Sequence, residues 1–449
     1  MGKRQPQAKP AARLGTATAV PGKDFSAEPS EPSKGWALPA LARRLELWLP
    51  MRWLAVLPLL AGLACGSGGS GGSSSSCDPY CLDAPDGGAD GGWWTAPVET
   101  SLPPLPAEPN AGRFIWFGAA QGLFASTIRM IDVGSDGTVW VATDSGLFAR
   151  PSGAASFQEL TVAEGLPSND VASVAAAGPG AAWVGFGASD LDPMSGAIPT
   201  GTPESGLGTV PRLGPQAAIV TLGASGPTVQ SIVLDQSGLT RSVFAVAADP
   251  ALPGGAWFAT DRGLFQRQPD GSVLGPRRPP VQSGWAFGLA VSASGQVWDG
   301  DDTQCSRLDP ADPALGFWAP FAEVIDVWPG ARDRISRLLL VSDGTLYLSS
   351  WANGLAIRSA RGAFSFLGVK DGLPSPWVSG VRPDPDGTLW VGSLRGLGRW
   401  DPAQRSWRYY TKASGLPADV VWTLAIEPTP TGRAVWIGTT GGVARFDGP

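Results

Sequence analysis

The amino-acid sequence predicts an all-β fold, a seven-bladed β-propeller of four-stranded blades, over residues 113–449. Three observations predict it. An aromatic anchor recurs along the chain, a Gly-Leu box precedes many anchors at a nearly constant distance, and the composition is rich in Gly and Pro with only 16% charged residues. A chain of many short strands joined by turns has this composition.

The first repeated element is a hairpin centred on an aromatic residue. Clear copies are DGTVWVATDSGLFAR (136–150), GGAWFATDRGLFQR (254–267) and DGTLWVGSLRGLGRWDP (386–402). Apolar alternation enters a turn of the form T-x-x-G and then resumes, which is typical of two antiparallel strands. The successive anchors lie 43, 74, 41, 49, 43 and 46 residues apart, and they are Trp140, Trp183, Trp257, Trp298, Tyr347, Trp390 and Trp436.

The interval between Trp183 and Trp257 is the longest, at 74 residues. We interpret it as an insertion of roughly thirty residues around 188–224, rich in Gly and Pro, which gives blade two a long surface loop. An eighth blade is the alternative. It would need two short periods of 37 residues, and no anchor is visible between the two tryptophans.

The second repeated element is the Gly-Leu box. It occurs as EGLPSNDV (164–171), DGLPSPWV (371–378) and SGLPADVV (414–421), with degenerate copies at 121–128 and 237–244. The distance from the box Gly to the next anchor is 18 to 21 residues in all five copies. In a four-stranded blade such a box joins the fourth strand to the next blade. It therefore lies on the same face as the T-x-x-G turn.

Together, the hairpin and the box resemble the two-component regulator propeller repeat, over residues 113–447. The resemblance implies a periplasmic sensing propeller, which in that family usually precedes a transmembrane helix and a histidine kinase. The sequence reaches Pro449 directly after its last hairpin. We therefore expect the fold and the binding role of that family, without direct phosphotransfer.

The two ends of the repeat region predict how the ring closes. The last copy finishes its third strand at Phe446 and Asp447, and no fourth strand follows it. The segment RFIWFGAA (113–120) has no hairpin of its own and aligns with the fourth strand RSWRYYTK (405–412). We expect residues 113–120 to complete blade seven and to remove its open edge.

The N-terminal part is interpreted as a targeting signal followed by a flexible linker. Residues 1–50 are expected to be disordered, or to lie upstream of the true start at Met51. The segment 51–65, MRWLAVLPLLAGLAC, resembles a bacterial lipoprotein signal peptide with lipidation at Cys65; a plain secretory signal is the alternative. Residues 66–112 form a Gly-, Ser- and Pro-rich linker. We expect a lipid-anchored protein of the bacterial envelope, periplasmic or on the cell surface.

Composition limits the chemistry. The chain contains no histidine, which excludes Ser-His-Asp and Cys-His catalysis and histidine metal sites, and its net charge of −6 argues against nucleic-acid binding. Cys77 and Cys81 are candidates for a small disulfide loop, and Cys305 for a free thiol. Asp299, Asp301 and Asp302 belong to the most irregular copy of the repeat, WDGDDTQ, which we interpret as drift in one blade; a cation site is the alternative. We expect no metal and no cofactor.

The boxes and the T-x-x-G turns predict the candidate site, because their variable positions converge around the axis. We expect Trp351 and Trp377 to be exposed and to stack on a ligand, with Arg395 binding a carboxylate or hydroxyl group. The other candidate ligand-binding residues are Asn353, Asp144, Asp261 and Arg262. Ordinary turn residues are the competing explanation at each of these positions.

The function predicted from the sequence is therefore non-enzymatic binding or sensing. The expected partner is a small glycan or peptide, or an envelope protein such as a sensor kinase. The alternatives are a structural adhesin and a propeller-fold lyase or hydrolase that uses carboxylates. Streptogramin-lyase-like propellers have a similar repeat, but they rely on histidine, which is missing here.

Overall fold

The computed structural model describes residues 102–110, 113–125, 127–187, 214–278, 285–301, 304–309, 321–328, 334–429 and 432–447. The chain divides into two compact units, Met1–Asp83 and Ala84–Pro449, and all described residues belong to the second. The predictions for the leader, the signal peptide, Cys65, Cys77 and Cys81 lie outside the described residues. No helix among the described residues is long and apolar enough to cross a membrane.

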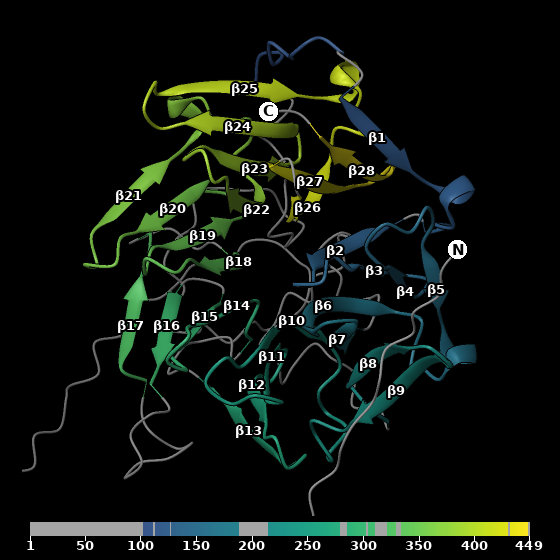
Figure 1. Ribbon diagram of the computed structural model, residues 1–449. Helices are drawn as coiled ribbons and strands as arrows, with labels where there is room; N and C mark the ends of the chain where they lie inside the picture. Colours follow the sequence, from purple (N-terminus) through teal and green to yellow (C-terminus); the bar gives the residue numbers. More distant parts are fainter. Residues whose placement is uncertain are drawn as a thin grey trace, which may run out of the picture. The chain divides into compact units, whose positions relative to one another are not determined.

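The described residues form seven antiparallel sheets of four strands each, arranged around one axis (Figure 1). Blade one contains β2 (Ile128–Val133), β3 (Val139–Thr143), β4 (Leu147–Arg150) and β5 (Gln158–Leu160). Blade two contains β6 (Val171–Gly178), β7 (Ala181–Phe186), β8 (Ala217–Gly223) and β9 (Gly226–Ile232). Blade three contains β10 (Val243–Ala248), β11 (Ala256–Thr260), β12 (Gly263–Arg267) and β13 (Val273–Arg277).

The other four blades repeat this order. Blade four contains β14 (Gly288–Val291), β15 (Val297–Gly300), β16 (Gln304–Leu308) and β17 (Glu323–Asp326). Blade five contains β18 (Ile335–Leu340), β19 (Leu346–Ser350), β20 (Leu355–Arg358) and β21 (Phe364–Leu367). Blade six contains β22 (Val378–Pro383), β23 (Leu389–Ser393), β24 (Gly396–Asp401) and β25 (Ser406–Tyr410). Blade seven contains β26 (Val421–Thr429), β27 (Gly432–Thr439), β28 (Gly442–Phe446) and β1 (Phe114–Phe117).

The ring closes as predicted. Strand β1 pairs antiparallel with β28, with Phe114 opposite Phe446 and Phe117 opposite Val443. The Phe117 ring is 4.8 Å from the Trp436 ring, so β1 also joins the aromatic core of its blade. The first residues of the propeller thereby supply the fourth strand of its last blade, and the seven-bladed prediction is confirmed.

The predicted insertion in blade two extends too far at its C-terminal end. Strand β8 occupies 217–223 and pairs with β7, with Gly185 opposite Ala217. Ala217, Ala218 and Val220 are buried, Ala217 in the core shared with blade three and the other two in the core shared with blade one. Because both faces of the segment are packed and it pairs with β7 and β9, it is the third strand of the blade and not part of the loop. The remaining inserted residues, 188–213, lie outside the described part.

The anchors fill the space between neighbouring sheets. Trp140, Trp257, Trp390 and Trp436 are fully buried on the second strands of their blades. The indole N–H of Trp390 donates to Asp384 at 2.8 Å, and that of Trp436 donates to Glu427 at 2.8 Å. In these two blades an acidic residue near the end of the first strand thus satisfies a buried donor. Trp390 and Trp436 therefore fix both the packing between blades and the adjacent turn, whereas the indole nitrogen of Trp140 has no hydrogen-bond partner among the described residues.

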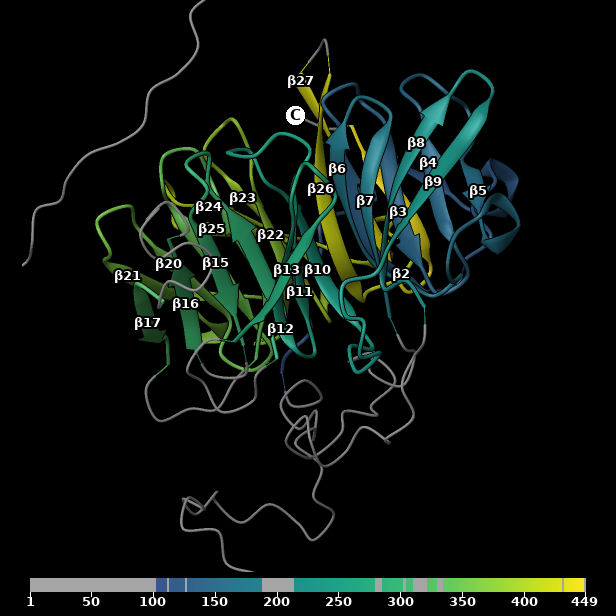
Figure 2. The ribbon, with the colours of Figure 1, turned by 90° about the horizontal axis from the view of Figure 1, so that it is seen from below.

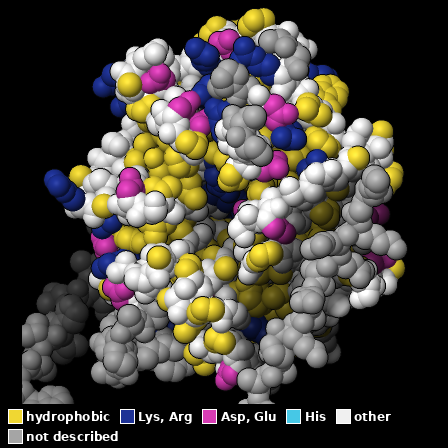
Figure 3. All heavy atoms as spheres, viewed as in Figure 1, with side chains coloured by type: hydrophobic (Ala, Val, Ile, Leu, Met, Phe, Trp, Pro, Cys, Tyr) yellow, Lys and Arg dark blue, Asp and Glu magenta, His cyan; other side chains and the backbone are white. Residues whose placement is uncertain are grey.

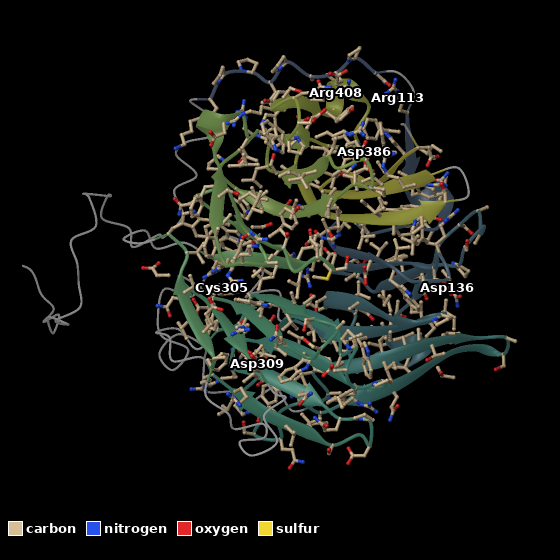
Figure 4. All side chains as sticks on the ribbon, turned by 60° about the vertical axis from the view of Figure 1, so that its left-hand side comes forward. Arg113, Asp136, Cys305, Asp309, Asp386 and Arg408 are labelled. Carbon is tan, nitrogen blue, oxygen red and sulfur yellow. The ribbon has the colours of Figure 1, made fainter. Side chains whose placement is uncertain are left out.

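The two faces of the ring differ in their turns. One face carries the Asp-Gly turns between the first two strands, where Asp136 and Asp386 accept the backbone N–H groups of Thr138 and Thr388 (Figure 4). In Figure 2 the tips of β26–β27 and β8–β9 lie along the upper edge, on this face. The opposite face carries the Gly-Leu boxes and is called the box face below.

Candidate functional site on the box face

The Gly-Leu boxes build the links that enter each blade. The first residues of three boxes close the short 3-10 turns η3 (Val162–Glu164), η7 (Val369–Asp371) and η8 (Lys412–Ser414). The box glycine that follows each turn has a positive φ, for example 90° at Gly372, a conformation that L side chains rarely adopt. The glycine reverses the chain and directs it toward the innermost strand. This explains the box pattern.

The turns between the second and third strands lie on the same face as the boxes, as predicted, and three of them also contact a box. The N–H of Gly354 in the blade-five turn donates to the carbonyl of Pro376 at 2.8 Å. In blade six, Arg395 donates to the carbonyl of Pro374 at 3.2 Å. The N–H of Thr440 in blade seven donates to the carbonyl of Val420 at 3.2 Å. Turns and boxes therefore form one continuous surface.

The innermost strands begin on this face with a recurring irregularity. The first strands of neighbouring blades contact one another around the axis. In six blades the register shifts directly after the first residue of this strand, so one residue bulges from the ladder. A bulge redirects a side chain. The bulged residues are Arg129, Ala172, Phe244, Ser336, Ser379 and Trp422.

Six aromatic side chains and one arginine, from five blades, form a continuous row at or near these strand starts and at the turn after β19 of blade five. We call this row the aromatic arc, and its residues are Phe244, Trp285, Phe287, Arg334, Trp351, Trp377 and Trp422. The Phe244 and Phe287 ring centroids are 4.7 Å apart. The Arg334 guanidinium carbon lies 4.1 Å from the Phe287 centroid and 4.4 Å from the Trp351 centroid. The row connects blades three to seven.

The predicted pair Trp351 and Trp377 lies inside this arc, but the two differ in exposure. Their ring centroids are 5.0 Å apart with an interplanar angle of 30°. Trp351 is only 6% exposed, because Trp377 and Arg334 both lie against it. The expectation that Trp351 is exposed is therefore wrong. Trp377, Arg334 and Phe244 are half-buried and give the arc its accessible surface.

The remaining predicted residues are placed differently. Arg395 binds backbone carbonyls of Pro374 and of Pro103, which lies in the segment that precedes blade one. Asn353 is half-buried in the blade-five turn, where its N–H donates to Ser350. Asp144 is exposed in the blade-one turn, outside the blades that form the arc. The backbone carbonyl of Arg262, in the blade-three turn, accepts a hydrogen bond from Arg278.

Asp261 has a structural position. It is fully buried and accepts the backbone N–H groups of Arg241 at 3.0 Å and Ser242 at 3.3 Å. The carboxylate thereby holds the box that enters blade three. Burial raises the pKa of Asp261 to about 6, against the opposing effect of these hydrogen bonds. The structure thus places this predicted ligand-binding residue beneath the face and not on it.

This raised pKa predicts a pH dependence of stability. A carboxyl group with a raised pKa in the folded state binds more protons there than in the unfolded chain. Its contribution therefore falls as the pH rises from about 4 to about 6, by roughly 3 kcal/mol for a shift of this size. We expect Asp261→Asn to flatten the stability profile over this range, as measured by urea unfolding at pH 4, 5, 6 and 7. An unchanged slope would contradict the assignment.

Two arginines that the sequence analysis missed, Arg129 and Arg337, lie on the innermost strands around the ring axis. Arg337, on β18, donates to the carbonyls of Phe244 at 3.5 Å and Arg129 at 3.2 Å, and so links blade five to blades three and one. Arg129 forms an ion pair with Asp170. Basic side chains are also visible at the middle of the opposite face (Figure 3). The positions equivalent to Arg129 in five other blades hold Ala, Phe, Ser, Ser and Trp, so the repeat pattern gives no signal for this arginine.

The irregular blade four contains a buried acid and a thiol. Asp299 is 1% exposed, and neither carboxylate oxygen has a hydrogen-bond partner among the described residues. Burial raises the pKa of Asp299 well above its usual range, and the nearby Asp301 adds to the effect. Cys305 is buried and free (Figure 4). Within the described ranges no group of three or more Cys, Asp and Glu residues is arranged to hold a metal ion.

Comparisons with known proteins agree with this architecture. Residues 372–395, which span most of one box and one turn, match the model of the two component regulator propeller family. The extracellular domain of the putative hybrid two component system BT3049 from B. thetaiotaomicron is similar in fold. Its TM-score is 0.56 at 16% identity, over 74% of this chain and 41% of that one. This chain thus spans about two fifths of that domain.

Two further propellers are similar in fold. A streptogramin B lyase has a TM-score of 0.53 at 13% identity, over 74% of this chain and 97% of the lyase. YCF48 bound to D1 peptide has a TM-score of 0.51 at 14% identity, over 78% of this chain and all of that one. No curated protein matches the sequence. The chain is a propeller similar in fold to the extracellular domains of putative hybrid two component systems.

Proposed function

We propose that this propeller is a non-enzymatic binding or sensor domain that recognises a small glycan or peptide, or a partner protein, through the aromatic arc. The observation that carries the proposal is the arc itself, in which side chains from five blades meet at the starts of the innermost strands. Such a row suits a ligand that stacks on aromatic and guanidinium faces. The fold-similar extracellular domains of putative hybrid two component systems support a sensing role.

The polar groups of the arc support a ligand with hydrogen-bonding capacity. Trp422 is 9% exposed, and its indole N–H has no hydrogen-bond partner among the described residues. A buried donor of this kind gains from a ligand oxygen. Arg334 presents a guanidinium group between two aromatic rings. A sugar hydroxyl or a peptide carbonyl would meet both the stacking faces and the donors.

The proposal includes an envelope location. The sequence pattern at Cys65 and the Gly- and Ser-rich residues that follow it support a propeller that stands away from a membrane on a lipid anchor. The C-terminal end of the predicted linker 66–112 is not part of this tether, because residues 102–110 contact blade six. A partner such as an envelope sensor kinase would then bind the propeller in its ligand-bound state. The likeness to the streptogramin B lyase keeps a lyase as the second candidate, and the absence of histidine argues against that mechanism.

The experiment is a binding screen followed by a matched pair of variants. The purified chain is applied to arrays of oligosaccharides and peptides, and the strongest binder is measured by isothermal titration calorimetry. We expect Trp377→Ala to weaken binding by about 1–3 kcal/mol, because it removes a half-buried stacking face of the arc. Trp351→Ala is less informative, because this buried residue also supports the fold.

The control is Phe366→Ala, which removes an exposed aromatic ring from the outer strand of blade five. It should leave the affinity unchanged. Equal affinity in the Trp377 variant and the wild type would place the site away from the arc. Chemical turnover of the bound probe, detected by mass spectrometry, would favour the lyase.

A further inference from the structure

A proline-rich segment lies along the outer edge of blade six. Residues 102–110 have the sequence LPPLPAEPN, and Ala107 forms a parallel bridge with Tyr409 on β25. The N–H of Glu108 donates to the carbonyl of Tyr409 at 2.7 Å. Strand β25 is the fourth strand of its sheet, so the segment covers part of an otherwise open edge.

Side chains on the box face hold the two ends of this segment. Arg395 donates to the carbonyl of Pro103 at 2.6 Å and to that of Leu102 at 3.5 Å. At the other end, the Ser414 hydroxyl donates to the carbonyl of Glu108. The segment is therefore bound at one end by Arg395 in the turn of blade six and at the other by Ser414 in the box that follows the blade.

These hydrogen bonds involve the extended backbone of the segment and not its side chains. Four of the nine residues are prolines, and all four are exposed, so they stiffen the segment without being buried. The hydrogen bonds described above engage three carbonyls of the segment, those of Leu102, Pro103 and Glu108, and one of its N–H groups. Extended proline-rich peptides have few N–H groups and expose their carbonyls. Proline-rich peptides bind in a preformed extended conformation, and here Arg395 and Ser414 supply donors to the carbonyls of such a segment.

We propose that the outer edge of blade six is a binding site for extended proline-rich peptides. In this chain residues 102–110 occupy it, and a partner protein that carries such a segment docks by replacing them. The bound segment is largely exposed and has few hydrogen bonds to the blade, which makes exchange feasible. This site lies at the edge of blade six, and the proposal does not depend on ligand binding at the aromatic arc.

The experiment uses two components. The first is a fluorescent peptide with the sequence of residues 102–110. The second is a replacement variant of the full chain, in which these nine residues are exchanged for Gly and Ser at equal length. Fluorescence polarisation should show saturable one-to-one binding to this variant. Binding to the wild-type chain should be at least about tenfold weaker, because the tethered segment competes at a high effective concentration. A folded replacement variant that fails to bind the peptide would overturn the proposal.

Matched substitutions in the replacement variant test the contacts. Arg395→Ala should weaken peptide binding about tenfold or more, because two charge-assisted hydrogen bonds are lost. Arg408→Ala is the control, since Arg408 is an exposed arginine on the same outer strand (Figure 4), and it should bind like the parent. Equal weakening by both substitutions would indicate only general charge attraction and would refute the site.

Discussion

Trp390→Ala is expected to lower the free energy of unfolding by about 3–5 kcal/mol. Trp390 is 0% exposed, and its ring lies 5.2 Å from Phe446 and 5.7 Å from Tyr410, between blades six and seven. Truncation leaves a cavity in a rigid interface and removes the indole donor of the buried Asp384. Urea unfolding followed by circular dichroism measures the loss.

The matched control for this variant is Trp116→Ala. Trp116 lies on β1 and is 55% exposed, and its indole N–H donates to the carbonyl of Gly415 at 2.6 Å. Loss of this single hydrogen bond should cost about 1 kcal/mol. The prediction depends on the contrast in burial, so equal losses for the two tryptophans would contradict the anchor role of Trp390.

Removal of β1 is expected to have an even larger effect. Deletion of residues 1–121 removes the fourth strand of blade seven, including Phe114 and Phe117, and reopens the ring. The aromatic contacts of Phe117 with Trp436 and of Phe114 with Phe446 are lost together. We expect a loss of about 5 kcal/mol or more, since truncation of one buried aromatic residue alone costs about 3–5 kcal/mol.

Two shorter deletions isolate the contribution of β1. Deletion of residues 1–101 keeps every described contact and should leave the melting temperature unchanged. Deletion of residues 1–112 also removes the segment on blade six and should cost only about 1–2 kcal/mol, for its few hydrogen bonds. If the 1–112 and 1–121 deletions melted at the same temperature, ring closure by β1 would be wrong.

The position of Arg395 connects the two proposed sites. The sequence analysis assigned it to the ligand, whereas in the structure it holds the carbonyls of Pro103 and Pro374. A partner that replaced residues 102–110 would contact the same turn and box that continue into the aromatic arc. Peptide docking and arc binding are nevertheless separable, because Trp377→Ala affects one and Arg395→Ala the other.

The sequence by itself determined the architecture of this protein. The anchors and boxes predicted seven blades, the closure by 113–120 and the shared face of turns and boxes, and all three are confirmed. These features depend on local patterns repeated many times. A strand needs alternation, a tight link needs a glycine with positive φ, and each sheet needs one bulky residue against its neighbour.

Only the tertiary structure decided which side chains meet and which are exposed. Trp351 occupies a turn like that of Asp144, yet it is buried because Trp377 and Arg334 reach it from adjacent links. Arg337 on blade five donates to backbone carbonyls of blades one and three. Arg395 binds residues nearly 300 positions away in the sequence. Such contacts depend on the directions in which bulges and turns orient side chains from separate blades. The periodicity within one repeat does not specify these directions.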